Sequence, residues 1–173
     1  MSIVAVVGNP RPGSRTLSVA IEAAQAIGRR VGAARAYDVV DLSGFGPQLL
    51  AAGTAPEVTA ALERVRDANV LVVASPTYKG TYTGLLKAFV DRFPPDALAG
   101  KVALPVLVMG DPKHSLAVEV HLRPLLVEVG AIVPTPGLTV LESQIPELEA
   151  HLAPWADRVA PQVASVLEAH ALP

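Results

Sequence analysis

The chain has 173 residues, of which 51% are hydrophobic and 17% charged, and its 16 acidic and 14 basic side chains leave a formal net charge of −2. This length predicts one domain over residues 1–173, and the apolar content excludes a mainly disordered chain. The near-neutral charge argues against nucleic acid or an anionic membrane as the main partner. The chain has no cysteine, which excludes disulfides, thiolate metal sites and cysteine nucleophiles.

The apolar residues do not predict a membrane span, because no uninterrupted apolar stretch approaches the roughly 18–20 residues that a membrane helix requires. The N-terminus lacks a basic segment followed by an apolar run, so the sequence indicates no secretory signal and favours the cytoplasm. The four histidines are scattered without the spacing of metal ligands, and no metal is expected.

Apolar periodicity and turn-forming residues divide the chain into alternating strands and helices. In chain order, the expected elements are a strand at 3–7, a helix at 16–30, a strand at 36–40, a long loop at 41–54, a helix at 56–66, a strand at 70–74, a helix at 84–92, a strand at 102–109, a loop at 110–114, a helix at 116–129, a strand-like segment at 131–141 and a helix at 146–168. Thr54 could cap the helix at 56–66, Pro124 should break the helix that contains it, and Pro134 and Pro136 confine the last strand to an edge.

The strand–loop–helix unit repeats five times, which indicates a parallel sheet with helices on both faces. Dinucleotide-binding and flavodoxin-like folds both follow this pattern. Five units in a chain of this length favour a three-layer flavodoxin-like fold with strand order 2-1-3-4-5. Ligands of such sheets bind beyond the carboxyl ends of the strands, at the switch in strand order. The loops at 8–16, 75–83 and 110–115 should therefore converge on one crevice.

The first of these loops carries hydroxyls and arginines at the predicted start of a helix. A helix N-terminus offers unpaired N–H groups and the positive end of the helix dipole. Ser14, Arg15 and Thr16 stand where they would meet a phosphate, and Arg11 could add a second positive charge. The loop matches neither the Walker pattern nor G-x-G-x-x-G. Alternatively, Ser14 or Thr16 only caps the helix and the arginines are solvated.

The second loop, at 75–83, combines two tyrosines, a lysine and several hydroxyls. Its backbone amides can bond the polar edge of a planar heterocycle, and Tyr78 can pack on the face of that ring. Donors at the ring edge, together with the charge of Lys79, would stabilise negative charge that develops on reduction. Alternatively, Tyr78 and Tyr82 cover the end of the sheet or a subunit contact.

These segments resemble the NAD(P)H-dependent FMN reductases of the flavodoxin-like superfamily, and the resemblance covers residues 1–132. Gly8–Arg11 with Ser14–Thr16 look like the phosphate loop of this family. Ser75–Lys87 followed by Asp91 look like its S/T-P-x-Y…G-x-L-K-x-x-x-D signature. Residues 110–114 with 116–124 look like its third loop and the helix that follows. Within this family, the segments are most similar to the branch of reductases that supply reduced flavin to monooxygenases of organosulfur scavenging.

The resemblance implies hydride transfer from NADH or NADPH to flavin N5, with no catalytic side chain acting as acid or base. Reduced FMN would then pass to a flavin-dependent monooxygenase or another acceptor. The residues that the resemblance assigns to FMN are Asn9, Arg11, Ser14, Arg15 and Thr16 for the phosphate, Pro76, Thr77, Tyr78 and Lys79 along the ring, and Gly110 and His114 at the other ring edge.

Two positions depart from the family pattern. Asn9 stands where members usually have serine, although its amide still offers hydrogen bonds. Asp111 stands where the branch commonly has a second glycine. A carboxylate near the flavin pyrimidine would disfavour anionic reduced flavin, so either Asp111 points to solvent or flavin binding is weakened.

Three further residues are candidates for contacts between subunits. Lys87 and Asp91 are four residues apart and share a helix face, either as a solvated pair or, by the resemblance, at the subunit contact. The predicted helix at 84–92 looks too apolar for one buried face, which favours a homodimer or homotetramer. His121 or Val120 could lie on a π-bulge that the branch carries at its tetramer contact, although a lone helical histidine is more often structural or solvated.

Other functions remain open at this point. One is an FMN-retaining quinone or azo reductase, and another is a flavodoxin-like electron carrier, against which the net charge and the arginines of the first loop argue. A receiver-type signalling domain would need clustered acids after the first strand, where this chain has Asn9-Pro10-Arg11. A phosphate-binding hydrolase would leave the loop at 75–83 without a role.

Overall fold

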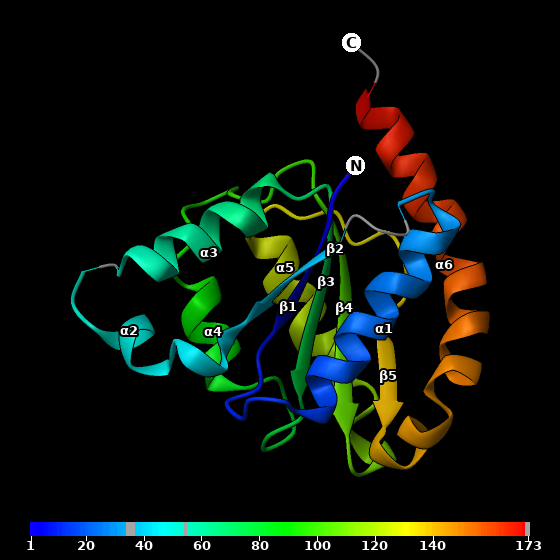
Figure 1. Cartoon of the computed structure of the whole chain (residues 1–173), viewed down its shortest axis with the longest axis horizontal. Coiled ribbons are helices and arrows are strands. Elements are labelled where there is room, and N and C mark those ends of the chain that lie inside the picture. Colours follow the sequence, from blue (N-terminus) through cyan, green and yellow to red (C-terminus); the bar gives the residue numbers. More distant parts are fainter. Residues whose placement is uncertain (34–36, 54, 172–173) are drawn as a thin grey trace.

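The computed structural model describes residues 1–33, 37–53 and 55–171. Its centre is a five-stranded parallel sheet of order β2-β1-β3-β4-β5 with helices on both faces, which confirms the predicted fold (Figure 1). The strands are β1 (Ile3–Val7), β2 (Tyr37–Asp41), β3 (Val70–Pro76), β4 (Val102–Met109) and β5 (Leu138–Leu141). Every residue of β1, β3 and β4 is buried, as expected for strands covered on both faces.

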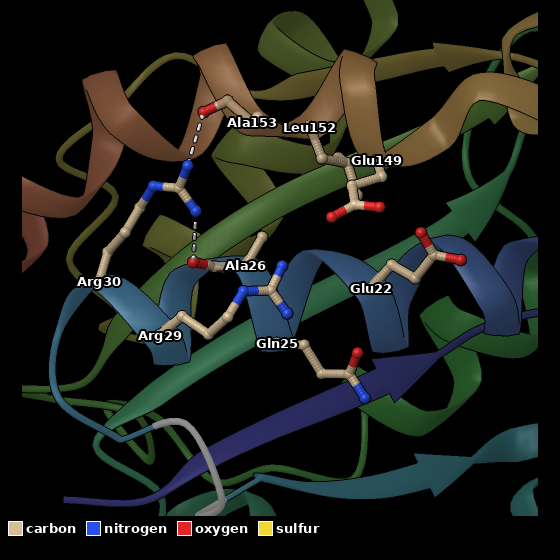
Figure 2. Close-up of a pocket in the computed structure, with 8 residues that line it drawn as sticks. All are labelled: Glu22, Gln25, Ala26, Arg29, Arg30, Glu149, Leu152 and Ala153. Atoms are coloured by element: carbon tan, nitrogen blue, oxygen red, sulfur yellow. Dashed lines mark hydrogen bonds between the residues drawn. The ribbon is translucent and has the colours of Figure 1, made fainter.

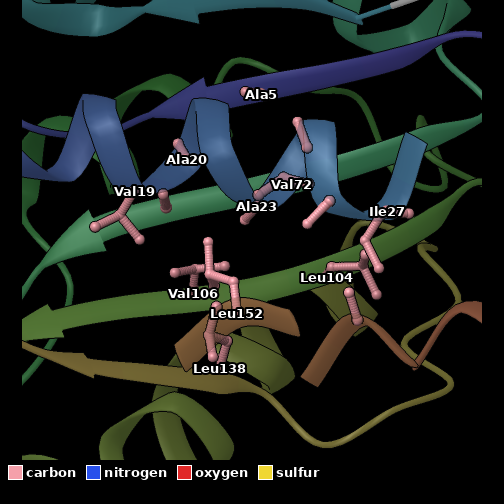
Figure 3. Packing of buried hydrophobic residues seen from close by; sticks show 14 of the residues in the cluster. Ala5, Val19, Ala20, Ala23, Ile27, Val72, Leu104, Val106, Leu138 and Leu152 are labelled. Atoms are coloured by element: carbon pink, nitrogen blue, oxygen red, sulfur yellow. The ribbon is translucent and has the colours of Figure 1, made fainter. Parts of the chain in front are cut away.

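Two helices, α1 (Arg15–Arg30) and α6 (Leu148–Ala171), cover one face of the sheet. Alanines at positions 20 and 23 let α1 lie close to the strands, and Ile27 completes its buried stripe (Figure 3). Leu152 brings α6 into the same cluster. Burying a leucine or isoleucine side chain of this kind contributes about 1.5–3 kcal/mol, so this cluster holds the two helices firmly on the sheet.

The opposite face is covered by shorter elements that share a second hydrophobic cluster. They are α2 (Gly46–Leu50), α3 (Pro56–Asp67), α4 (Gly84–Val90), the π-helix η3 (Val118–Leu122) and α5 (Arg123–Glu128). None of the helices in the described part of the chain is long and apolar enough to span a membrane.

The long loop expected at 41–54 is wrong, because this stretch contains the 3₁₀ helix η1 (Leu42–Gly44) and α2. The Asp41 carboxylate accepts a hydrogen bond from the Ser43 amide and thereby begins η1. Leu42 and Leu49 are buried in the second cluster, so packing stabilises two turns that turn-forming residues alone do not predict. The proposed cap Thr54 and the expected strand residue Ala36 lie outside the described residues.

The strand expected at 131–141 is also wrong over most of its length, because β5 covers only Leu138–Leu141 and residue 132 adds a single bridge to β4. Proline has no N–H to donate to a strand ladder, and two prolines lie in this segment. The Arg123 guanidinium donates instead to the carbonyl oxygens of Val133 (2.8 Å) and Thr135 (2.5 Å). Side-chain hydrogen bonds therefore replace the missing ladder, and β5 stays at the sheet edge as expected.

The helix expected at 116–129 is divided into η3 and α5. Pro124 lies in the first turn of α5, where the missing N–H costs no helical hydrogen bond, so the predicted break occurs at this proline. Val120 and His121 both lie in the π-helix, which confirms the position suggested for a π-bulge. The remaining predicted elements begin and end within three residues of their expected bounds.

Candidate functional site

The loops after β1, β3 and β4 meet at the carboxyl end of the sheet, as predicted. In Figure 1 the arrowheads of β3, β4 and β5 point to the same lower end, where these loops lie. The Gly8 amide donates to the Ala74 carbonyl, and the Thr77 amide donates to the Val108 carbonyl, both at 2.8 Å. Each loop therefore leaves its strand while still tied to the neighbouring strand.

A cavity of about 380 Å³ opens between these loops. We call it the crevice, and its lining residues are Asn9, Arg11, Pro12, Gly13, Ser14, Arg15, Thr16, Pro76, Tyr78, Val108 and Glu142. Seven of these residues were predicted from the sequence, whereas Pro12, Gly13, Val108 and Glu142 were not. Of the predicted flavin residues, Thr77, Lys79, Gly110 and His114 do not line the crevice itself.

The first loop is held in shape by its own polar side chains. Asn9 is buried, and its amide nitrogen donates to the Thr16 hydroxyl at 3.1 Å while its amide oxygen accepts from the Arg11 amide at 3.0 Å. The Ser14 hydroxyl accepts a hydrogen bond from the Leu17 amide and caps α1, as the alternative interpretation expected. Asn9 therefore organises the loop around the start of the helix, a role that a serine side chain is too short to reproduce in both directions.

Two arginines give this loop its charge. The side chain of Arg11 is exposed and makes no ion pair with any described residue. Arg15 is paired with Glu142, with 2.5 Å between the guanidinium Nη1 and the carboxylate Oε2. Together with the N-terminus of the 16-residue helix α1, these guanidinium groups make the crevice favourable for an anion.

Hydrogen bonds of Thr83 connect the second loop to the first. Its hydroxyl donates to the Gly8 carbonyl at 2.5 Å and accepts from the Leu86 amide at 3.1 Å, and so caps α4. The Thr83 amide donates to the Ser75 hydroxyl at 3.0 Å. A methyl group on Gly8 would lie 2.6 Å from Leu86 Cβ, so the first loop can approach α4 only because this residue is glycine.

The tip of the second loop is a tight hairpin between Tyr78 and Thr81, closed by a 2.9 Å bond from the Tyr78 amide to the Thr81 carbonyl. Lys79 and Gly80 at the tip both have positive φ, of 54° and 85°. Positive φ is uncommon for lysine, and such backbone strain is concentrated at functional sites. Tyr78 keeps 42% of its surface exposed beside the crevice.

Thr77 provides a test of whether a ligand fits here. Its hydroxyl is buried and has no hydrogen-bond partner among the described residues. An unsatisfied buried hydroxyl costs free energy, which a polar ligand atom beside it would recover. The orphaned hydroxyl, the anion-favouring first loop and the exposed tyrosine together fit a phosphorylated planar ring such as FMN.

The third loop contains the 3₁₀ helix η2 (Pro112–His114) instead of remaining irregular as expected. Asp111 begins η2 by accepting from the Lys113 amide at 3.0 Å, and its carboxylate pairs with Lys113 Nζ at 2.8 Å. The hydrogen bonds from Lys113 hold the pKa of Asp111 below its usual value. A methyl group on Gly80 would lie 3.9 Å from His114 Nδ1, so the second and third loops meet at this histidine.

The residues predicted for subunit contacts lie away from the crevice. Lys87 and Asp91 form an exposed ion pair of 2.6 Å on α4, which raises the pKa of Lys87. His121 is exposed on η3 beside a cavity of about 430 Å³ that Tyr82 and Val120 also line. Leu86, Phe89 and Val90 are buried in the chain's own second cluster, whereas Leu85 and Phe93 are only partly buried, so the subunit contact expected from this helix stays a prediction.

A larger cavity, of about 470 Å³, lies between α1 and α6 (Figure 2). Arg30 crosses this groove and donates to the carbonyl oxygens of Ala26 (3.1 Å) and Ala153 (3.2 Å), and its Nε donates to Asp157 at 2.6 Å. None of the lining residues belongs to the three loops at the carboxyl end of the sheet. Seven of the predicted flavin residues thus line the smaller cavity, whereas Arg30 joins α1 to α6 across the larger one. No cluster of metal-ligating side chains occurs within the described ranges.

The strand order and the three converging loops define a flavodoxin-like protein with a flavin-type crevice at the switch in strand order. A sequence model described as NADPH-dependent FMN reductase matches residues 1–144, so the chain belongs to this family. The match confirms the predicted enzyme class, with FMN and NADPH or NADH as substrates or cofactors.

Individual relatives agree with this assignment. The chain is 33% identical over 151 residues to "FMN reductase (NADPH)" of Escherichia coli (strain K12), covering 84% of this chain and 75% of that protein. It is 31% identical over 112 residues to "NADH-dependent FMN reductase SfnF" of Pseudomonas fluorescens (strain Pf0-1), covering 61% and 60%. The solved structure of an NADH:FMN oxidoreductase (EMOB) in its apo form matches with a TM-score of 0.78 and 32% identity, covering 92% of this chain and 88% of that one.

Proposed function

We propose that this chain reduces FMN with a hydride from NADH or NADPH in the crevice and supplies reduced flavin to a partner oxygenase or another acceptor. The observation that carries the proposal is the junction of an anion-favouring loop and a loop with an orphaned buried hydroxyl at the switch in strand order. The flavin would supply the redox chemistry, by accepting the hydride from nicotinamide C4 at its N5. The side chains then need only bind, orient and exclude water, without acting as acid or base.

The phosphate end of the site would be formed by the first loop. Arg11 and Arg15 would provide charge-assisted hydrogen bonds, and the Ser14 hydroxyl can still donate its proton while it caps α1. Asn9 and Thr16 would hold the loop in shape through their mutual hydrogen bond, in addition to any direct contact with the phosphate. This division of roles refines the prediction that all five residues bind the phosphate directly.

The ring end would be formed by the second and third loops. Pro76 and Tyr78 would line the ring, and the buried Thr77 hydroxyl beside them would turn toward the crevice to bond a polar atom of the ligand. Lys79, Gly110 and His114 would approach from the outer side, where a side chain at Gly110 would meet no neighbouring atom. The ion pair with Lys113 partly offsets the negative charge of Asp111, so this departure from the family pattern is compatible with reduced flavin.

The proposal includes a homodimer or homotetramer, with Lys87, Asp91 and His121 at the contact. What supports it is the set of large apolar side chains exposed on and beside η3 and α5: Leu116, Val120 and Val127. Exposed apolar residues that gather around a π-helix are typical of an interaction surface. The cytoplasmic location expected from the sequence stays a prediction.

Steady-state oxidation of NADH and NADPH, with and without added FMN, tests the function together with the absorbance spectrum of the purified protein. We expect oxidation that depends on added FMN and a protein that loses flavin on gel filtration. Flavin that stays bound while quinone accelerates turnover would favour the FMN-retaining quinone reductase. Bound flavin without any nicotinamide oxidation would refute the proposal in favour of an electron carrier.

The phosphate assignment is tested by Arg15→Ala. We expect FMN affinity, measured by flavin fluorescence, to fall about tenfold because a charge-assisted hydrogen bond is lost at a half-open site. Riboflavin lacks the phosphate, so its affinity should not change. Arg66→Ala, on the exposed surface of α3, is the matched control. Unchanged FMN affinity in Arg15→Ala would contradict the assignment.

A further inference from the structure

The crevice contains one carboxylate among its described lining residues, and it lies on the phosphate-binding side. Glu142 is the first residue of the 3₁₀ helix η4 (Glu142–Glu147), which follows β5 directly. The chain therefore brings it to the carboxyl end of the sheet, 127 residues away from Arg15 in sequence. There its Oε2 lies 2.5 Å from Arg15 Nη1.

This ion pair conflicts with anion binding. The donors of a guanidinium that are engaged by a carboxylate are not free for a phosphate, and a carboxylate that stays nearby repels a dianion. The side chains of Arg15 and Glu142 are 63% and 49% exposed, so the pair is weak and can open in solvent. An exchangeable pair of this kind reduces affinity without closing the site.

We propose that Glu142 is an internal competitor for the flavin phosphate, which occupies Arg15 in the flavin-free chain and keeps FMN affinity low enough for the flavin to leave after each turnover. The inference rests on the proposed function and assigns FMN to the role of an exchanging substrate. Glu142 acts through Arg15, so it is a positioning residue and takes no part in the hydride transfer.

The test compares Glu142→Gln with the wild type by titration with FMN and, separately, with riboflavin. Glutamine keeps the shape of the side chain and removes its charge. We expect FMN to bind about three- to tenfold more tightly and to dissociate correspondingly more slowly, whereas riboflavin affinity stays the same. The matched control is Glu147→Gln, because Glu147 is exposed at the other end of η4 and forms no ion pair with a described residue.

Each outcome separates this inference from the proposed function. If wild type and Glu142→Gln bind FMN equally, the competitor role is wrong while the reductase function stands. If Glu142→Gln binds FMN more weakly, Glu142 instead orients Arg15 for the phosphate, and the inference is overturned. Equal tightening of FMN and riboflavin would show that the effect does not act at the phosphate. If neither protein binds FMN, the proposed function fails, and this inference fails with it.

Discussion

Arg123 provides a quantitative test of how the irregular segment before β5 is held. Its guanidinium donates to the carbonyl oxygens of Val133 and Thr135 and to the Glu119 carboxylate, with 2.5 Å between Nε and Oε2. The other oxygen of Glu119 accepts from the Gly137 amide. One side-chain pair on η3 and α5 thus satisfies three backbone groups in a segment whose prolines prevent a strand ladder.

We expect Arg123→Ala to lower the free energy of unfolding by about 2–4 kcal/mol. Hydrogen bonds to charged groups contribute roughly 1.5–3 kcal/mol each, and three are lost. The expected loss is smaller than three times this value because the side chains of Arg123 and Glu119 are 26% and 33% exposed. Water can therefore replace part of the lost hydrogen bonding. Urea unfolding followed by circular dichroism measures the change. Arg66→Ala, which removes an exposed arginine without an ion pair to a described residue, should change it by less than about 0.5 kcal/mol.

The same network predicts a pH dependence. The hydrogen bond from Arg123 lowers the pKa of Glu119 below its ordinary value of 4.5, against the opposing effect of burial. A lowered folded-state pKa stabilises the protein above the unfolded-state pKa, and this contribution is lost as pH falls through the folded-state pKa. Wild type should therefore be more stable than Glu119→Gln near neutral pH. This difference in the free energy of unfolding should shrink below about pH 4.5.

Two results would refute this reasoning. If Arg123→Ala costs no more than Arg66→Ala, other contacts hold residues 133–137 and the guanidinium is incidental. If the cost of Glu119→Gln is the same at pH 3 as at pH 7, the carboxylate charge is not what stabilises the segment. A double-mutant cycle between the two positions separates their mutual coupling from the carbonyl contacts of Arg123 alone.

Two further predictions concern the helices. Arg30→Ala removes the donors to Ala153 and Asp157 that join α1 to α6 across the larger cavity, and we expect the free energy of unfolding in urea to fall by about 1–3 kcal/mol with FMN affinity unchanged. A loss of FMN affinity instead would mean that this cavity belongs to the site. Lys87→Ala combined with Asp91→Ala should shift the sedimentation coefficient toward smaller species if α4 lies at a subunit contact. An unchanged sedimentation coefficient would indicate that Lys87 and Asp91 form a solvated ion pair, which stabilises the helix by only a few tenths of a kcal/mol.

The sequence predicts the sheet well because its central strands are continuous apolar runs. A strand buried on both faces leaves no polar position, and β1 and β4 show this pattern over their whole length. The elements that were missed are short and depend on distant contacts. The 3₁₀ helix η1 and α2 are stabilised by burying Leu42 and Leu49 in a cluster assembled from the whole opposite face, which local periodicity cannot reveal.

The position of the crevice was predictable for a different reason. Parallel strands bring all of their carboxyl ends to one edge, so turn-rich loops after strands one, three and four had to meet there. The shape of these loops was not predictable, because it depends on pairings such as Asn9 with Thr16 and Thr83 with Gly8. Asn9 illustrates the limit, since its identity indicates hydrogen bonding but not that both ends of its amide are used within the loop.

Glu142 shows that the convergence of strand ends at one edge of the sheet also applies outside the three glycine-rich loops. The fifth strand also ends at the binding edge, and an acidic residue directly after it was visible in the sequence. Its partner could not be identified, because the pairing requires the start of α1 to lie beside η4, the helix that follows the last strand. The charge balance of a parallel-sheet site should therefore be estimated from the residues that follow every strand, including strands whose loops carry no ligand-binding signature.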